Sequence, residues 1–203
     1  MIGTGIQLTD PSVAAMAGMA GFDFAAIDTE HGPADYQKVL AQVIAARSGG
    51  AYSMVRVPWN EPYLAKRVLE TGPDAILFPM VNTAEEAKKA MDSCVYPPAD
   101  KRGIGPMRAQ RYGLTPMPAY VEESERACPH DSNQERDGGA QFDAILKTPY
   151  LDAVLIGPCD LSFSIGKSGD VRCAENLKLI DETVGKCKRA QMPVGIWVGG
   201  RDG

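Results

Sequence analysis

The sequence has only two histidines among its 203 residues, and no two of its five cysteines form a Cys-x-x-Cys pair. The cysteines, at positions 94, 128, 159, 173 and 187, are odd in number and scattered, which predicts reduced thiols and excludes a structural zinc site. No apolar run reaches the ~18 residues that a membrane helix needs. The N-terminus lacks a signal-peptide pattern, and no Asn-x-Ser/Thr acceptor for glycosylation occurs. We therefore expect a cytoplasmic protein without a membrane partner.

An excess of basic residues is also lacking. The net charge is −5, whereas a nucleic-acid surface normally needs a basic stripe, so a nucleic-acid partner is not expected. The hydrophobic fraction of 44% and the charged fraction of 23% are typical of a soluble globular protein. A chain of this length can bury a full core, and we expect a single domain over residues 1–203.

What is present is an alternation of short apolar runs with helical segments. Asp10 and Pro11 are an N-cap and a first helical residue, and Thr83 to Glu86 form a capping box. Between Tyr36 and Arg47 the apolar residues Val39, Leu40, Val43 and Ile44 recur at helical spacing. The pattern predicts helices over 12–20, 36–47, 61–70, 83–94 and 174–190, and strands over 2–6, 24–27, 53–57, 75–78, 151–156 and 194–198.

Short buried strands separated by single helices predict a parallel sheet with right-handed crossovers. A β/α barrel of eight strands takes ~250 residues, so a chain of 203 is about one βα unit short. A doubly wound open sheet is the alternative. Polar residues follow the strands throughout the chain, which favours an incomplete (β/α)8 TIM-barrel type fold.

One of the two histidines lies directly after a buried strand. Phe24–Ile27 runs into Asp28-Thr29-Glu30-His31, and chemistry in parallel α/β sheets gathers at the carboxyl ends of the strands. An acid beside an imidazole selects its tautomer and supports proton transfer. We therefore expect Asp28 and His31 to form a catalytic pair; the alternative is a polar surface loop.

A second candidate, Arg56, lies inside a predicted strand. A cation is costly to bury unless an anion meets it. Arg56 therefore has two interpretations: it binds a substrate carboxylate or a developing enolate oxygen, or it forms a structural ion pair with an acid of a neighbouring strand.

A third strand end carries Gly157-Pro158-Cys159-Asp160-Leu161. Gly157 allows a ligand to approach the backbone closely. Asp160 is suited to bind a hard divalent cation. It could also be the N-cap of a short helix that begins at Leu161, and both roles can hold at once.

These strings together resemble a known family. In matching order they are similar to the metal-dependent, pyruvate-specific class II aldolases of the HpcH/HpaI aldolase/citrate lyase family, such as 4-hydroxy-2-oxoheptanedioate aldolase and 2-dehydro-3-deoxyglucarate aldolase. The resemblance runs from near residue 1 to about Val198. The strings that carry it are Asp-x-Glu-His-Gly-Pro at 28–33, Val-Arg-Val-Pro at 55–58, Pro-Pro at 97–98 with Arg-Gly-Ile-Gly-Pro at 102–106, and Gly-Pro-x-Asp-Leu-Ser at 157–162.

The resemblance implies a β/α barrel, a homo-oligomer (commonly a hexamer that exchanges its last helix) and a retro-aldol reaction that releases pyruvate from a 2-oxo acid. It implies Mg²⁺ or Mn²⁺, with Co²⁺ as another candidate, held in part by Asp160. By the same resemblance, Arg56 steadies the keto or enolate oxygen and His31 with Asp28 handles the proton. The backbone of Gly157 and Pro158 cradles the pyruvate carboxylate. No Schiff-base lysine is needed.

The chain departs from the family pattern in two places. The family's second metal carboxylate comes from a buried strand, but residues 127–139 are polar, with a proline and paired glycines, and we expect no central strand there. Glu135 is the nearest candidate for that ligand. A reading frame shifted by one nucleotide over 130–133 permits Met-Ile-Gln-Ile, so an error in the gene's reading frame is an open hypothesis. The second departure is that no eighth strand and helix follow Val198.

Two kinds of function follow. One is an active aldolase acting on a 4-hydroxy-2-oxo (di)carboxylic acid or a 2-keto-3-deoxy sugar acid. The other is a truncated or inactive member with a role in binding or assembly. A lyase acting on a coenzyme A thioester is a weaker alternative, because no basic groove for the nucleotide is seen in the sequence.

Overall fold

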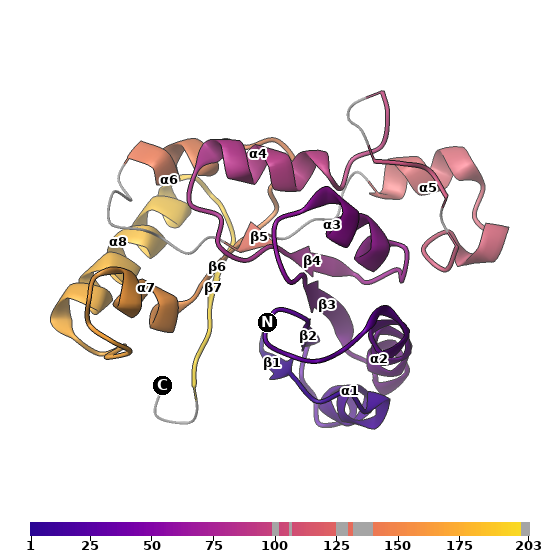
Figure 1. Cartoon of the computed structure of the whole chain (residues 1–203), viewed down its shortest axis with the longest axis horizontal. Coiled ribbons are helices and arrows are strands. Elements are labelled where there is room, and N and C mark those ends of the chain that lie inside the picture. Colours follow the sequence, from indigo (N-terminus) through magenta and orange to yellow (C-terminus); the bar gives the residue numbers. More distant parts are fainter. Residues whose placement is uncertain (99–101, 106, 125–129, 132–139, 200–203) are drawn as a thin grey trace.

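The computed structural model describes residues 1–98, 102–105, 107–124, 130–131 and 140–199 of the chain (Figure 1). Its first half alternates strands and helices: β1 Gly3–Ile6, α1 Pro11–Met19, β2 Phe24–Asp28, α2 Tyr36–Gly49, β3 Tyr52–Arg56, α3 Pro62–Leu69, β4 Ala75–Leu77 and α4 Ala84–Asp92. The second half contains the 3-10 helix η1 Arg111–Gly113, α5 Met117–Ser124, β5 His130–Asp131, α6 Ala140–Ile145, β6 Val154–Ile156, α7 Pro158–Ser164, α8 Ala174–Arg189 and β7 Val194–Ile196. None of the described helices could span a membrane.

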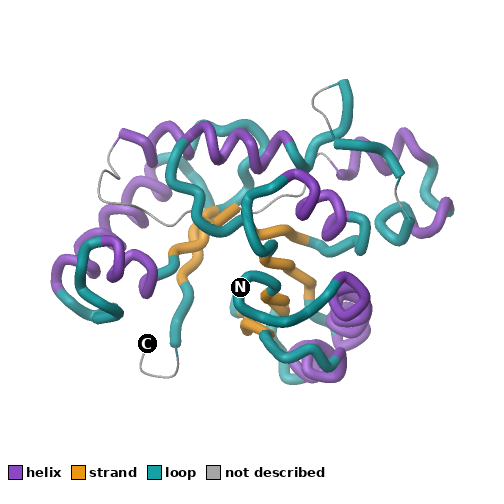
Figure 2. The backbone as a smooth tube through the Cα atoms, viewed as in Figure 1, coloured by secondary structure: helices purple, strands orange, loops and turns teal. Residues whose placement is uncertain are grey.

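The strands form two parallel sheets whose order follows the chain. One sheet has the order β1-β2-β3-β4 and the other has the order β5-β6-β7. β4 and β5 are in contact where the two sheets meet, and the helices lie around the strands (Figures 1 and 2). A doubly wound sheet reverses its strand order at a switch point, and no reversal occurs among the described strands. The predicted fold of the α/β barrel type is therefore confirmed.

The helix ends follow the predicted capping signals. The Asp10 carboxylate accepts a hydrogen bond from the backbone N–H of Ser12 at 2.9 Å, and Pro11 is the first residue of α1. Thr83 and Glu86 form both hydrogen bonds of the capping box at the start of α4. Gly50 ends α2 in the left-handed conformation, with φ of 94°.

The core lies between the first sheet and helices α2 to α4. Ile27, Val55 and Ile76, on three adjacent strands, are fully buried against Val39 and Val43 of α2 and the inner faces of α3 and α4. The predicted apolar face of α2 is therefore right for Val39 and Val43.

Part of the predicted face of α2 is wrong. Ile44 is 46% exposed, whereas Gln42 and Ala46 are buried. Gln42 is accommodated because its amide Nε2 donates a hydrogen bond to the backbone oxygen of Leu8 at 2.7 Å.

Two local predictions in the second half of the chain are also wrong. Within the polar segment 127–139, His130 and Asp131 form the short strand β5, which pairs in parallel with Val154 and Leu155 of β6. Backbone pairing between strands does not require apolar side chains, so two polar residues can form a strand beside β6. Helix α7 begins at Pro158 with Gly157 as its N-cap, so Asp160 lies in the first turn and is not the N-cap. Proline suits the first helical position because its missing N–H has no intrahelical partner there.

Candidate active site at the strand ends

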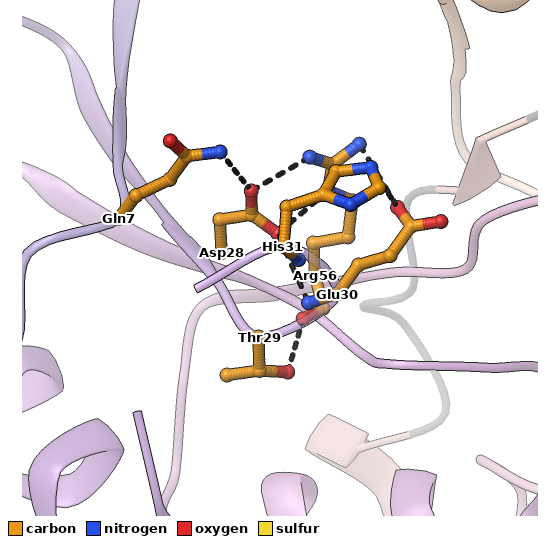
Figure 3. A network of polar contacts seen from close by, with 6 residues as sticks. All are labelled: Gln7, Asp28, Thr29, Glu30, His31 and Arg56. Carbon is orange, nitrogen blue, oxygen red and sulfur yellow. Dashed lines mark hydrogen bonds and ion pairs between the residues drawn. The ribbon is translucent and has the colours of Figure 1, made fainter. Parts of the chain in front are cut away.

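The candidate site begins with two residues that face each other across neighbouring strands. Asp28 ends β2, Arg56 ends β3, and the register of the two parallel strands sets them directly opposite. The Arg56 guanidinium donates to both carboxylate oxygens of Asp28, from Nε at 3.0 Å and from Nη2 at 2.8 Å (Figure 3). Both side chains are largely buried, so this bidentate pair forms out of bulk water.

The Asp28 carboxylate has further donors. The Gln7 side-chain amide donates to it at 3.0 Å, and the backbone N–H groups of Glu30 and His31 donate at 3.0 and 3.2 Å (Figure 3). Burial by itself would raise the pKa of Asp28, but the hydrogen bonds from Arg56 and Gln7 outweigh it and lower the pKa to about 2. Asp28 is therefore ionised at every physiological pH, and its carboxylate orients Arg56 and the turn that follows β2.

The shape of that turn explains Gly32. A Cβ atom on this residue would lie 2.3 Å from the backbone oxygen of Asp28. The chain therefore folds back over the strand end only with glycine at this position, and the fold-back brings the N–H groups of Glu30 and His31 to the Asp28 carboxylate.

The predicted side-chain pair of Asp28 with His31 is not found. Asp28 contacts His31 through the backbone N–H, whereas the imidazole Nε2 lies 3.7 Å from Oε2 of Glu30. The His31 side chain is 58% exposed, and Figure 3 shows it beside Arg56 and Glu30. Arg56 donates to both oxygens of the Asp28 carboxylate, which orients this carboxylate towards the guanidinium. The catalytic roles of Asp28 and His31 stay predictions.

Glu30 is a site residue that the sequence reasoning missed. Its carboxylate forms an ion pair with Nη1 of Arg56 at 3.0 Å, so the guanidinium lies between two carboxylates (Figure 3). Burial raises the pKa of Glu30, and the charges of Asp28 and Asp160 add to this, against the opposing effect of Arg56 and His31. The sequence signal was present, because two carboxylates flank the histidine motif, but spacing alone did not show which one reaches the imidazole.

The third strand end carries Asp160. It lies in the first turn of α7, directly after β6, and its negative charge contributes to the raised pKa of Glu30. Asn176 of α8 is fully buried and donates its amide to the backbone oxygens of Pro158 at 3.1 Å and Val171 at 3.0 Å. The turn with Gly157 and Pro158 is therefore tied to α8.

A second residue missed by the sequence reasoning is Trp197, directly after β7. Its ring centroid lies 5.4 Å from the guanidinium carbon of Arg56, within the range of a cation–π contact. A Cβ atom on Gly5 of β1 would lie 3.0 Å from the same indole. Trp197 therefore reaches from β7 to β1 and covers one side of Arg56.

The chemistry of the donor groups bears on the metal that the family resemblance implies. Asp160 and Glu30 supply carboxylate oxygens, which suit a hard divalent cation. Within the described ranges, no three His, Cys, Asp or Glu side chains are grouped closely enough to hold a metal ion. Glu135, the other predicted ligand, lies outside the described residues.

The sequence matches a family model over most of its length. The model described as HpcH/HpaI aldolase/citrate lyase matches residues 3–196. The chain is 32% identical over 197 residues to a hydroxypyruvate/pyruvate aldolase of Roseovarius nubinhibens, covering 97% of this chain and 77% of that protein. It is 33% identical over 196 residues both to a 4-hydroxy-2-oxo-heptane-1,7-dioate aldolase of Salmonella dublin and to a 5-keto-4-deoxy-D-glucarate aldolase of Citrobacter koseri. These two alignments cover 96% of this chain and 74% and 76% of the respective proteins.

The fold is similar to that of solved structures. A crystal structure of an HpcH/HpaI aldolase/citrate lyase family protein from Burkholderia cenocepacia superposes with a TM-score of 0.92 and 29% identity. The match covers all of this chain and 81% of that one. An HpcH/HpaI aldolase from Desulfitobacterium hafniense superposes with a TM-score of 0.90 at 23% identity, which shows a common fold.

Proposed function

Because this chain belongs to the HpcH/HpaI aldolase/citrate lyase family, we propose that it cleaves a 4-hydroxy-2-oxo acid by a retro-aldol reaction, with pyruvate and an aldehyde as products. The substrate class that we propose is a 4-hydroxy-2-oxo (di)carboxylic acid or a 2-keto-3-deoxy sugar acid. The single observation that best supports this proposal is Arg56, a buried guanidinium held between Asp28 and Glu30 at the strand ends.

A retro-aldol reaction removes the proton of the 4-hydroxyl group and breaks the bond between C3 and C4. The electrons of that bond move onto the pyruvate fragment, whose C2 oxygen becomes an enolate. Arg56 would stabilise this negative charge, since its position is set before substrate binds by two carboxylates. Trp197 covers the guanidinium on one side and limits the access of water to it.

The proton requires a separate group. His31 is exposed enough to meet the substrate, and Glu30 lies 3.7 Å from its Nε2. We propose that His31 accepts the hydroxyl proton, directly or through a water molecule, and returns a proton to C3 of the enolate. Asp28 would not carry the proton, because its pKa of about 2 keeps it ionised.

Family members are dependent on a divalent metal, and we extend this dependence to the chain as a proposal, with Mg²⁺ or Mn²⁺ as the first candidates. When bound, such an ion polarises the C2 carbonyl as a Lewis acid. Asp160 would be one of its ligands, and the turn at Gly157 and Pro158 would lie beside the substrate carboxylate.

The alternative of a non-catalytic member is not favoured, because the curated relatives that cover nearly all of this chain are aldolases.

We also propose a homo-oligomer. The aromatic side chains of Trp59, just before α3, and Tyr63, in α3, are 53% and 65% exposed and are suited to an interface. Size-exclusion chromatography with light scattering tests this, and a monomer at all concentrations contradicts it.

Release of pyruvate from 4-hydroxy-2-oxoheptanedioate tests the proposed function. We expect turnover with Mg²⁺ or Mn²⁺, loss of turnover after chelation and recovery when the metal is restored. Asp160→Asn should lower metal affinity at least tenfold, because it removes the charge of one ligand. Asp181→Asn, the same change at an exposed position on α8, is the matched control. Turnover that chelation leaves unchanged contradicts the metal proposal, and no turnover with any 4-hydroxy-2-oxo acid contradicts the reaction.

A further inference from the structure

A polar cavity lies at the opposite ends of the strands from the candidate active site. It has a volume of about 190 Å³, room for about six water molecules. Asp74, which precedes β4 and donates its backbone N–H to the backbone oxygen of Ser53 near the start of β3, forms part of its wall. The charged lining residues are Arg47, Arg102, Arg108, Arg111, Asp74 and Glu123.

Positive charge exceeds negative charge around this cavity. Arg47 forms a bidentate pair with Asp74, at 2.6 and 3.2 Å. Arg102 lies 3.3 Å from Glu70, a residue outside the lining. After these two pairs are set aside, Arg108 and Arg111 face one further carboxylate, Glu123.

Arg108 is fixed in place by neutral groups. Its Nη1 donates to the backbone oxygens of Thr71 and Gly72, just after α3, at 2.8 and 3.0 Å. Burial lowers the pKa of Arg108, and the charge of Arg47 lowers it further. A guanidinium under such repulsion gains when an anion enters the same space.

Arg102 is an independent indication of a ligand. Its side chain is 2% exposed, it lines the cavity, and its Nε–H has no acceptor among the described residues. A buried N–H donor of a guanidinium without a partner is costly and needs an acceptor. The other nitrogens donate to the backbone oxygen of Cys94 and to Glu70 and Tyr120, so the arginine is held rigidly.

We propose that this cavity binds a small oxyanion with phosphate or short-dicarboxylate chemistry, at a site separate from the strand ends where Arg56 lies. Guanidinium groups present paired N–H donors that match the oxygens of phosphate and carboxylate. Arg111 is the contact that can be removed at least cost, since its side chain is exposed and has no partner among the described residues. The proposal does not depend on the retro-aldol reaction.

Calorimetric titration of the full chain with inorganic phosphate and, separately, with malonate tests the proposal at constant ionic strength set by chloride. We expect saturable binding of at least one of them: phosphate alone identifies a tetrahedral oxyanion, and malonate alone identifies a dicarboxylate. Arg111→Gln should weaken this binding about tenfold, because it removes one charged donor. Arg189→Gln on the exposed face of α8 is the matched control and should leave it unchanged.

Arg56→Lys separates this cavity from the strand ends, and it too should leave the binding unchanged. Weakening by Arg56→Lys and not by Arg111→Gln would place the anion at the strand ends and overturn the proposal. Equal weakening by Arg189→Gln, or no saturable binding of either anion, would also overturn it. Circular dichroism of each variant shows that the fold is retained, and Arg108→Lys provides a second substitution in the same cavity.

Discussion

Replacing Asp28 with asparagine removes the carboxylate that holds Arg56 and the turn after β2. The variant keeps the size and part of the hydrogen bonding of the side chain, and we expect Glu30, which lies 3.0 Å from Arg56 in the wild type, to remain paired with it. The main loss is therefore the ionised state of a buried carboxylate that accepts hydrogen bonds from Arg56, Gln7 and two backbone N–H groups.

The magnitude follows from the pKa of Asp28. Its ordinary value of 3.8 falls to about 2 in the folded protein. A carboxyl whose pKa is lowered by folding stabilises the protein above its unfolded pKa, and this stabilisation is lost as the pH falls through the folded pKa. The gap corresponds to about 2 kcal/mol at pH 7, of which about half remains at pH 3 and little at pH 2.

Urea unfolding between pH 3 and pH 7 measures this effect as the difference between the wild type and Asp28→Asn. We expect the variant to be less stable by at least about 2 kcal/mol at pH 7, with the difference shrinking by about 1 kcal/mol at pH 3. Other acids titrate in both proteins and cancel in the comparison. Asp181→Asn, at an exposed position, serves as the control and should show no such trend. A difference that stays constant across this range would refute the assignment of a low pKa to Asp28.

Three further substitutions test the site and the fold. Arg56→Lys should lower kcat for pyruvate release about 10²- to 10³-fold, because one ammonium group cannot form both ion pairs that position the guanidinium between Asp28 and Glu30. A decrease of less than threefold would exclude a role of Arg56 in stabilising charge. His31→Gln should lower kcat about 10²-fold or more with a smaller effect on KM, and the pH dependence of kcat should lose one ionisation; an unchanged pH profile would assign the proton to another group. Thr83→Ala should lower the free energy of unfolding by about 1 kcal/mol, measured with urea, because it breaks the capping box of α4. An unchanged free energy of unfolding would show that α4 needs no cap.

The sequence predicted much of the fold from local signals. The apolar run before Asp28, the cap at Asp10 and the capping box at Thr83 each depend on neighbouring residues, and each is present in the structure. The fold class followed because short buried strands alternating with single helices admit few arrangements. The two-residue strand β5 could not be predicted in this way, because it forms through pairing with β6, a partner distant in the sequence.

The partners within the candidate site were harder to predict than its location. The sequence indicated that Asp28, His31 and Asp160 follow strands and that Arg56 lies within one, and parallel topology brings strand ends to one rim. It did not show that the Asp28 carboxylate accepts hydrogen bonds from the Arg56 guanidinium rather than from the imidazole of His31. Glu30 was overlooked for the same reason, since its contact with Arg56 depends on how the turn folds back at Gly32.

The amino-acid sequence by itself determined most of the helices and strands, the type of fold, the family and the strand ends at which chemistry gathers. These depend on short-range periodicity, caps and motifs, which a linear pattern records. Only the tertiary structure decided that Arg56 lies between two carboxylates, that Trp197 covers it, and that Arg47 lines one cavity with three arginines more than fifty residues further along the chain. Such contacts join side chains that are tens of residues apart, and their distances are set by strand register and helix packing.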